Sequence, residues 1–293
     1  MTTATGVVGR FAPSPTGPLH FGSLVAAVAS YCDAKSRGGQ WLLRIEDVDL
    51  TRRVSGASED IISTLQTYGF QWDSEIVYQS QRDALYQQAL DTLIASDSVY
   101  PCTCSRKEIA DSSTLQGIEG AIYPGTCRTH AIKPNVTPAW RMKTSHVQIG
   151  FKDLIQGPVA HWMDTDIGDF VLKRADDLFS YQLAVTVDDA AQGITHVVRG
   201  ADLLHSTPRQ LCLQRALGFT TPLYAHIPLV THADGQKLSK QTLAHPLPAD
   251  NVIPTLLHAF QFLRRFPEPI PVFQRLPDCW DWAIRHWCPY GAA

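Results

Sequence analysis

Blocks of apolar and polar residues at the start of the chain predict a strand, a helix and a second strand. Val7 to Ala12 predicts a short strand, and the next six residues hold three prolines and a glycine, which force a rigid turn. Ser23 to Lys35 is rich in Ala, Leu and Val without a breaker and is closed by Gly38, so it predicts a helix. Trp41 to Ile45 is apolar and predicts another strand. This order forms a βαβ unit, from which parallel sheets are built.

The same patterns predict more helices and strands along the chain. We expect helices at Ser58 to Tyr68, Gln81 to Asp97 (with Ser80 and Asp83 as a capping pair), Pro208 to Leu217 and Val252 to Arg264, and strands at His196 to Arg199 and Ala225 to Thr231. Between these two groups, cysteines, prolines and glycines are dense from Tyr100 to Pro138, and short β-like runs follow at Trp140 to Lys143 and Val159 to Met163. We therefore expect an α/β protein with an inserted module, and proline-rich sequence after its last clear helix.

Composition narrows the class of protein. The chain has 293 residues, 44% of them hydrophobic, and a formal net charge of −3, which argues against coating nucleic acid by bulk electrostatics. No window approaches the ~20 apolar residues of a membrane span, and the first nine residues do not resemble a secretory signal. We expect a soluble, cytoplasmic protein without membrane contact.

The turn before the first helix has the character of an anion site. His20, Gly22 and Ser23 lie where free backbone N–H groups and the helix dipole converge, and glycine permits close approach of a phosphate. The alternative is that His20 only caps the helix. Neither a P-loop nor a Rossmann glycine fingerprint is present at this turn.

A second candidate phosphate site is the loop Lys237 to Gln241, which follows Asp234-Gly235. Its lysines, Lys237 and Lys240, form a cation pair suited to a triphosphate whose charge shifts during reaction. Taken alone, such a loop is more often solvated surface.

Together the two motifs resemble a known family. The stretch Arg10 to Gly22 closely resembles the opening signature of glutamyl-tRNA synthetases, which are class I synthetases, and Lys237 to Gln241 is similar to their KMSKS loop. Two departures are visible: Ser23 replaces the second histidine of the HIGH-type element, and Gln241 replaces the final serine. The resemblance implies His20 and Lys240 as catalytic residues and ATP with Mg²⁺ as a substrate. It implies that ATP is bound by His20, Gly22, Ser23, Lys237, Ser239 and Lys240.

The resemblance also implies a glutamate site. By position it assigns glutamate binding to Arg10, Phe11, Ala12, Pro13, Ser14, Glu46, Tyr181 and Arg199. An arginine suits the substrate's side-chain carboxylate, and a buried glutamate suits its ammonium group. Without the resemblance, Glu46 beside Asp47 and Asp49 would be interpreted as part of a solvated acidic turn.

Three cysteines predict one structural zinc ion. Cys102, Cys104 and Cys127 lie within 26 residues in a chain where a disulfide framework is not expected. Spacing favours His130 as the fourth ligand, whereas the resemblance favours Tyr123. The other cysteines are interpreted as structural; they are Cys32, Cys212, Cys279 and Cys288.

The resemblance finally indicates which synthetase family to expect. About fifty residues follow the lysine loop, too few for the anticodon-reading region of a full glutamyl-tRNA synthetase, and this pattern resembles the shorter glutamyl-queuosine tRNA(Asp) synthetase family. Its members activate glutamate without tRNA and transfer it to queuosine in the anticodon loop of tRNA(Asp). The alternatives are a truncated synthetase charging the 3′ end of tRNA(Glu), or a catalytically silent tRNA-binding relative.

The implied organisation has four parts, and we expect a monomer. Residues 1–98 and 177–241 would form the two halves of a Rossmann-type class I catalytic domain, residues 99–176 an inserted zinc-binding module of the acceptor-binding type, and residues 242–293 a short C-terminal helical segment.

Overall fold

A parallel sheet lies at the centre of the fold. The computed structural model describes residues 6–230 and 245–290. In it β1 (Val8–Phe11) pairs in parallel with β2 (Gln40–Ile45), β2 with β3 (Val77–Tyr78), and β11 (His196–Gly200) with β12 (Leu223–Ile227). The amide of Thr195 donates to the carbonyl of Val8 (3.0 Å), which brings β11 beside β1. The predicted βαβ unit is therefore confirmed, and segments distant in sequence meet at β1.

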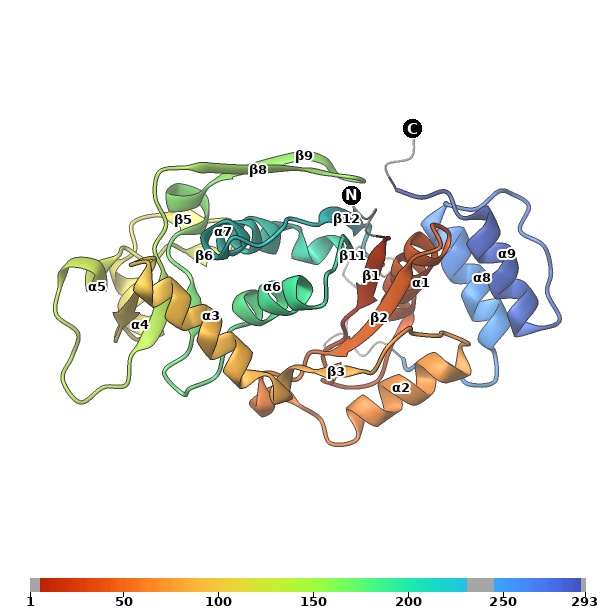
Figure 1. The fold of residues 1–293 in the computed structure, drawn as a ribbon, viewed down its shortest axis with the longest axis horizontal. Coiled ribbons are helices and arrows are strands. Elements are labelled where there is room, and N and C mark those ends of the chain that lie inside the picture. Colours follow the sequence, from red (N-terminus) through yellow and green to blue (C-terminus); the bar gives the residue numbers. More distant parts are fainter. Residues whose placement is uncertain (1–5, 231–244, 291–293) are drawn as a thin grey trace, which may run out of the picture.

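Helices that precede and follow the insertion in the sequence pack around this sheet. Those of the catalytic body are α1 (Phe21–Lys35), α2 (Ala57–Thr67), α3 (Asp83–Ala95), α6 (Tyr181–Ala191), α7 (Thr207–Leu217), α8 (Val252–Leu263) and α9 (Leu276–His286), with 3₁₀ turns η1 (Leu50–Arg52), η2 (Gln79–Gln81) and η4 (Ala201–Ser206). Figure 1 shows α8 and α9 next to α1 at one end of the molecule. Tyr31 of α1 meets Trp41 and Trp280 edge to face (5.0 and 4.9 Å between ring centroids), so aromatic packing joins the C-terminal helices to the sheet.

The inserted segment forms a separate group of small elements at the other end (Figure 1). An antiparallel sheet has the order β10-β7-β4, and a long hairpin, β8 with β9, leaves it. These elements are β4 (Val99–Cys102), α4 (Arg106–Ser112), β5 (Gln116–Gly117), β6 (Gly120–Ala121), α5 (Thr126–Thr129), β7 (Ala139–Met142), β8 (Gln148–Asp153), β9 (Gly157–Trp162), the π-helical turn η3 (Met163–Ile167) and β10 (Val171–Lys173). The hairpin runs back along the molecule towards β12 (Figure 1), where the amide of Leu154 donates to the carbonyl of Tyr224 (2.9 Å).

Outside the insertion, the structure differs from the sequence-based expectations at three helices. The third helix begins at Asp83, after Arg82, and Ser80 does not cap it: its hydroxyl donates to Asp47 (2.7 Å). Helix α6 was not predicted, because its buried side carries acidic residues among β-branched ones. Helix α9 was missed as well, since its surroundings are rich in proline.

The remaining predicted strands and helices are present within two residues of their expected ends, except the strand predicted at Ala225 to Thr231. That strand runs from Leu223 to Ile227, and Thr231 itself lies outside the described residues. No helix among residues 6–230 and 245–290 is long and apolar enough to cross a membrane. The division of the chain into four parts stays a prediction.

Candidate active site and metal centre

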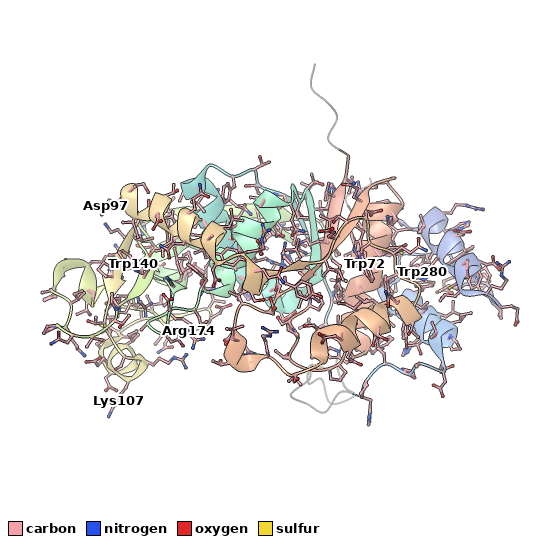
Figure 2. All side chains as sticks on the ribbon, turned by 60° about the horizontal axis from the view of Figure 1, so that its bottom comes forward. Trp72, Asp97, Lys107, Trp140, Arg174 and Trp280 are labelled. Carbon is pink, nitrogen blue, oxygen red and sulfur yellow. The ribbon has the colours of Figure 1, made fainter. Side chains whose placement is uncertain are left out.

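A cavity of about 1520 Å³ opens at the carboxyl ends of β1, β2 and β11 and extends to the inserted module. Ligands of open parallel sheets bind at this position, outside the strand ends. The module contributes Cys104, Arg106 and Arg141 to its wall, and Arg174 lies on the catalytic side of the module (Figure 2). The cavity is larger than glutamate alone requires, since pockets for small ligands measure about 300–1000 Å³.

The structure gathers most of the predicted site residues around this cavity. Those lining it are Arg10, Phe11, Ala12, Pro13, Ser14, His20, Gly22, Ser23, Glu46, Tyr181 and Arg199. Lys237, Ser239 and Lys240, predicted for the second phosphate motif, lie outside the described residues.

His20 lies at the N-terminus of α1. Its Nδ1 accepts a hydrogen bond from the amide of Ser23 (3.3 Å), so the histidine caps the helix, which was the alternative interpretation of this residue. Because Gly22 and Ser23 line the cavity beside it, the same helix end also presents its positive pole to that cavity. Capping and phosphate binding are therefore compatible here.

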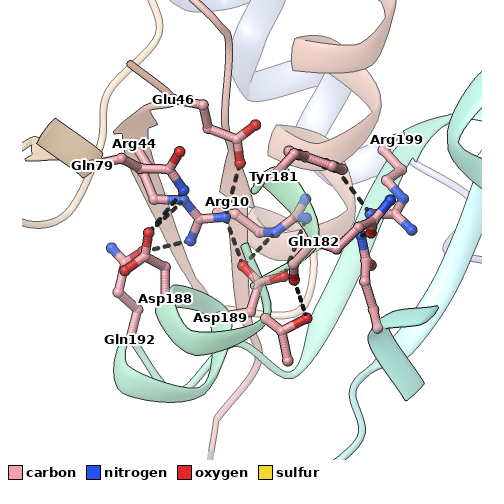
Figure 3. Close-up of polar contacts among 12 residues, drawn as sticks. Arg10, Arg44, Glu46, Gln79, Tyr181, Gln182, Asp188, Asp189, Gln192 and Arg199 are labelled. Carbon is pink, nitrogen blue, oxygen red and sulfur yellow. Dashed lines mark hydrogen bonds and ion pairs between the residues drawn. The ribbon is translucent and has the colours of Figure 1, made fainter. Parts of the chain in front are cut away.

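An ion network lies beside the predicted glutamate site, near the carboxyl ends of β1 and β2. Nε of Arg10 is 3.1 Å from Oδ1 of Asp189, and Nη2 of Arg44 is 2.8 Å from the same oxygen. Nη2 of Arg44 also lies 3.3 Å from Oε1 of Glu46 (Figure 3). The four side chains are between 0% and 7% exposed, so each charge depends on the others for compensation.

A second aspartate, Asp188, supports the same network. It accepts hydrogen bonds from Gln79 (2.8 Å), Arg82 (2.6 Å) and Tyr86 (2.7 Å). Both aspartates come from α6, so that helix fixes the arginines of two strands.

The electrostatic environments of Glu46 and Asp189, which both pair with Arg44, differ. Burial raises the pKa of Glu46, and Asp189 adds to this, while Arg44 and Arg10 oppose it. Burial opposes ionisation of Asp189 too, but Arg10 and Arg44 hold its pKa below the usual range. Asp189 therefore stays ionised and balances the charge of the arginines. The protein stabilises the ionised form of Glu46 less well, so Glu46 favours a cationic partner in the cavity.

Tyr181 and Arg199 form the other wall of the site. Nη1 of Arg199 lies 3.5 Å from the hydroxyl of Tyr181, and burial raises the pKa of that tyrosine to about 12, so it stays a neutral donor or acceptor. Together with Glu46 and Arg10, these residues surround the cavity with groups of both charges, as an amino acid requires.

Sequence reasoning missed Arg44, Asp188 and Asp189. Arg44 was included in an apolar strand, yet an arginine inside such a strand needs a buried carboxylate partner. The sequence signal for that partner was the adjacent pair Asp188 and Asp189, which precede Arg199 by 11 and 10 residues.

The three predicted cysteines meet in the module. The sulfur atoms of Cys102, Cys104 and Cys127 lie within 4.8 Å of one another, and the hydroxyl of Tyr123 is 3.4 Å from the first two. Ligand atoms around a tetrahedral zinc ion, with Zn–S about 2.3 Å, lie roughly 3.8 Å apart, so the donor set fits. His130 is exposed and bonds locally to Thr126, and it is not among the metal-ligand candidates of the described residues.

The thiols of this cluster differ in acidity. Burial raises the pKa of Cys104 to about 11. For Cys127, burial is outweighed by hydrogen bonds from Tyr123 and the Thr103 backbone, which lower the pKa to about 7. One thiol is therefore readily ionised, and the thiolate is the form of cysteine that binds a metal ion.

Comparison with known proteins is consistent with this geometry. The model of the family described as "tRNA synthetases class I (E and Q), catalytic domain" matches residues 6–252, so the chain is a class I tRNA synthetase and hence a ligase. It is 53% identical over 280 residues to a glutamyl-Q tRNA(Asp) synthetase of Dechloromonas aromatica, covering 95% of this chain and 93% of that one. A protein of the same name from Aromatoleum aromaticum is 51% identical, with 96% and 88% covered. The chain belongs to the glutamyl-Q tRNA(Asp) synthetase family.

A solved structure supports the fold. The glutamate-tRNA synthetase of Elizabethkingia anophelis superposes with a TM-score of 0.78 at 24% identity. The alignment covers 96% of this chain and 66% of that protein, so the chain spans about two thirds of its length. The catalytic fold of class I synthetases, predicted from the two motifs, is confirmed.

Proposed function

We propose that this protein activates glutamate with ATP, without tRNA, and transfers it to the queuosine base in the anticodon loop of tRNA(Asp). The observation that carries the activation half is the meeting of Arg10, Glu46, Tyr181 and Arg199 around one cavity, beside the His20 helix end. The names of relatives at 50–53% identity support the acceptor half.

Activation joins the α-carboxylate of glutamate to the α-phosphate of ATP and releases pyrophosphate. The carboxylate oxygen forms the new P–O bond as the bond to the leaving pyrophosphate breaks, and no covalent intermediate with the protein is needed. Positioning and charge stabilisation therefore dominate. His20 and the backbone donors of Gly22 and Ser23 would hold phosphate oxygens, and Lys240 would stabilise charge on the leaving group.

Glutamate binding would divide between the two sides of the cavity. Glu46 would hold the substrate ammonium, and the cationic groups of Arg10 and Arg199 the side-chain carboxylate, with Tyr181 beside it. The segment from Phe11 to Ser14 would approach the substrate with its backbone. In the second step the adenylate is attacked by a hydroxyl of queuosine, which forms an ester and releases AMP.

Mg²⁺ would accompany ATP and neutralise its charge. Cys102, Cys104, Cys127 and Tyr123 would hold zinc, which supplies a structural crosslink to the module when bound.

Two measurements test this proposal. ATP–pyrophosphate exchange should depend on glutamate, and Lys240→Ala should lower it by about 10²–10³-fold; exchange at the parent rate would remove Lys240 from the mechanism. Labelled glutamate should then appear on tRNA(Asp) that carries queuosine, in the anticodon fragment after nuclease digestion. Label at the 3′ terminus instead, or equal charging of tRNA without queuosine, would favour a truncated glutamyl-tRNA synthetase. No exchange with any amino acid would favour a silent relative.

A further inference from the structure

Arg199 is held by contacts that leave only part of its guanidinium for a substrate. Its Nε donates to Nε2 of His226 (3.0 Å), and its Nη2 donates to the hydroxyl of Thr207 (2.9 Å) and the carbonyl of Leu203 (3.3 Å). Its Nη1 points instead to Tyr181, on the cavity side. One edge of the guanidinium is thus fixed to the protein, and the other faces the proposed glutamate site.

The contact from Arg199 determines which tautomer His226 must adopt. Because Nε of an arginine only donates, Nε2 of His226 must accept and cannot carry a proton. The proton is then on Nδ1, which lies 2.6 Å from Oδ2 of Asp153. Burial lowers the pKa of His226 and, together with the charge of Arg199, outweighs the hydrogen bond to Asp153 that raises it, so the neutral form persists at neutral pH. The chain Asp153–His226–Arg199 therefore has one consistent direction of donation.

Asp153 belongs to the inserted module, at the end of β8. Its Oδ1 accepts the amides of Ile155 and Gln156 in its own turn (3.0 and 2.9 Å) and the amide of His226 (3.2 Å). Asp153 is ionised, because these hydrogen bonds outweigh the burial that opposes them and lower its pKa. The side chains of Asp153 and His226 are both 0% exposed, so water does not compete for these contacts.

We infer that Asp153 and His226 are positioning residues for amino-acid recognition: the tip of the module hairpin orients Arg199 towards the substrate carboxylate through the tautomer of His226. This inference rests on the proposed role of Arg199 in binding glutamate. It gives the inserted module a part in amino-acid selection, in addition to any part in binding the acceptor.

The most specific test is Asp153→Asn. An asparagine keeps one oxygen for the three backbone amides, but its NH₂ group now donates to Nδ1 of His226. The proton moves to Nε2, where it faces the N–H of Arg199, so Arg199 must shift; a comparable change of tautomer cripples other Asp–His pairs. We expect KM for glutamate in pyrophosphate exchange to rise by up to about 10²-fold, with KM for ATP unchanged.

Two further variants isolate the chain of contacts. His226→Gln retains an oxygen acceptor for Arg199 and an N–H donor for Asp153, and should keep KM near the parent value, whereas His226→Leu should raise it as Asp153→Asn does. Gln156→Ala is the matched control: it removes another bond of the same hairpin tip, from Nε2 of Gln156 to the carbonyl of His226 (2.8 Å), without touching the imidazole. It should leave KM for glutamate unchanged.

The outcomes separate the inference from the proposed function. A parent KM in Asp153→Asn, an equal rise for ATP and glutamate, or an equal rise in Gln156→Ala would overturn the positioning role. If the parent enzyme activates a different amino acid, the proposed function is wrong, and KM for that amino acid then tests the positioning role. Nitrogen NMR of the His226 ring provides a readout independent of activity: protonation at Nδ1 in the parent and at Nε2 in Asp153→Asn is expected, and no change between them would overturn the inference.

Discussion

Arg44 and Asp189 form an ion pair inside the protein: Nη2 of the arginine lies 2.8 Å from Oδ1 of the aspartate, and the arginine side chain is 0% exposed. Asp189 also pairs with Arg10, so one carboxylate holds arginines from two neighbouring strands. Because Arg10 lines the cavity and Arg44 does not, the aspartate links a binding residue to a supporting one.

Asp189→Asn should destabilise the protein and weaken glutamate binding. Removing one partner of a buried ion pair leaves uncompensated charge, so the free energy of unfolding should fall by about 3–5 kcal/mol. The matched control is Asp97→Asn, which removes a pair with Lys143 in which the aspartate is 90% exposed, and which should cost under about 1 kcal/mol. Denaturant unfolding of both variants checks this; equal losses would show that the buried network contributes no more than a surface pair.

Glu46→Gln should lower activity without lowering stability. The folded-state pKa of Glu46 is raised, so ionised Glu46 reduces stability as pH rises through that pKa, and the neutral glutamine removes this cost at pH 7. The substrate ammonium loses its counter-charge, so kcat/KM for glutamate should fall about 10- to 100-fold. Thermal unfolding and pyrophosphate exchange measure the two effects, and a large drop in Tm would contradict the account.

The pH dependence of the parent enzyme follows from the same shift. As pH falls, Glu46 should take up a proton at a higher pH than an exposed glutamate does, because burial raises its pKa. KM for glutamate should then rise while KM for ATP stays constant. In Glu46→Gln this rise should be absent, which distinguishes Glu46 from titration of the substrate itself.

His20→Asn and His20→Ala should separate capping from catalysis. Asparagine is a strong N-cap and can accept from the Ser23 amide, whereas alanine cannot and should cost about 1 kcal/mol of stability. Both variants lack the imidazole, so both should lose about 10²–10³-fold in pyrophosphate exchange. If His20→Asn keeps parent activity, the histidine is only a cap.

The metal centre should depend on Tyr123 and not on His130. We expect Cys127→Ser to abolish bound zinc, Tyr123→Phe to weaken its retention against a chelator, and His130→Ala to change neither. Elemental analysis after dialysis checks the content. Metal loss in His130→Ala with retention in Tyr123→Phe would reverse the assignment of the fourth ligand.

Local rules accounted for the strands and helices with clear patterns and failed where tertiary contacts decide. Helix α7 carries Pro208 in its first turn and Gly218 as a left-handed cap, and it was predicted because both signals are local. The start of α3 was not predicted correctly, because the hydroxyl of Ser80 donates to Asp47, which is distant in sequence, and does not cap the helix.

The candidate site divides in the same way. Residues that lie in continuous motifs, such as Arg10 to Ser14 and His20, could be assigned from a resemblance. Arg44, Asp189 and His226 could not, because each acts through a partner on another element, at 145 residues' separation for Arg44 and Asp189 and 73 for His226 and Asp153. Their roles become visible only when the partners are seen together.

The hairpin tip has a consequence for how the molecule opens. Turns at the end of a hairpin usually exchange their amide hydrogens quickly, but here the amides of Leu154, Ile155 and Gln156 are all bonded, one of them to β12. Exchange of the Leu154 amide therefore requires separation of the hairpin tip from β12, whereas the amides of Ile155 and Gln156 exchange when the turn held by Asp153 opens. Insertion and sheet should open as one cooperative unit, so truncating the insertion would weaken the β12 region of the catalytic body as well.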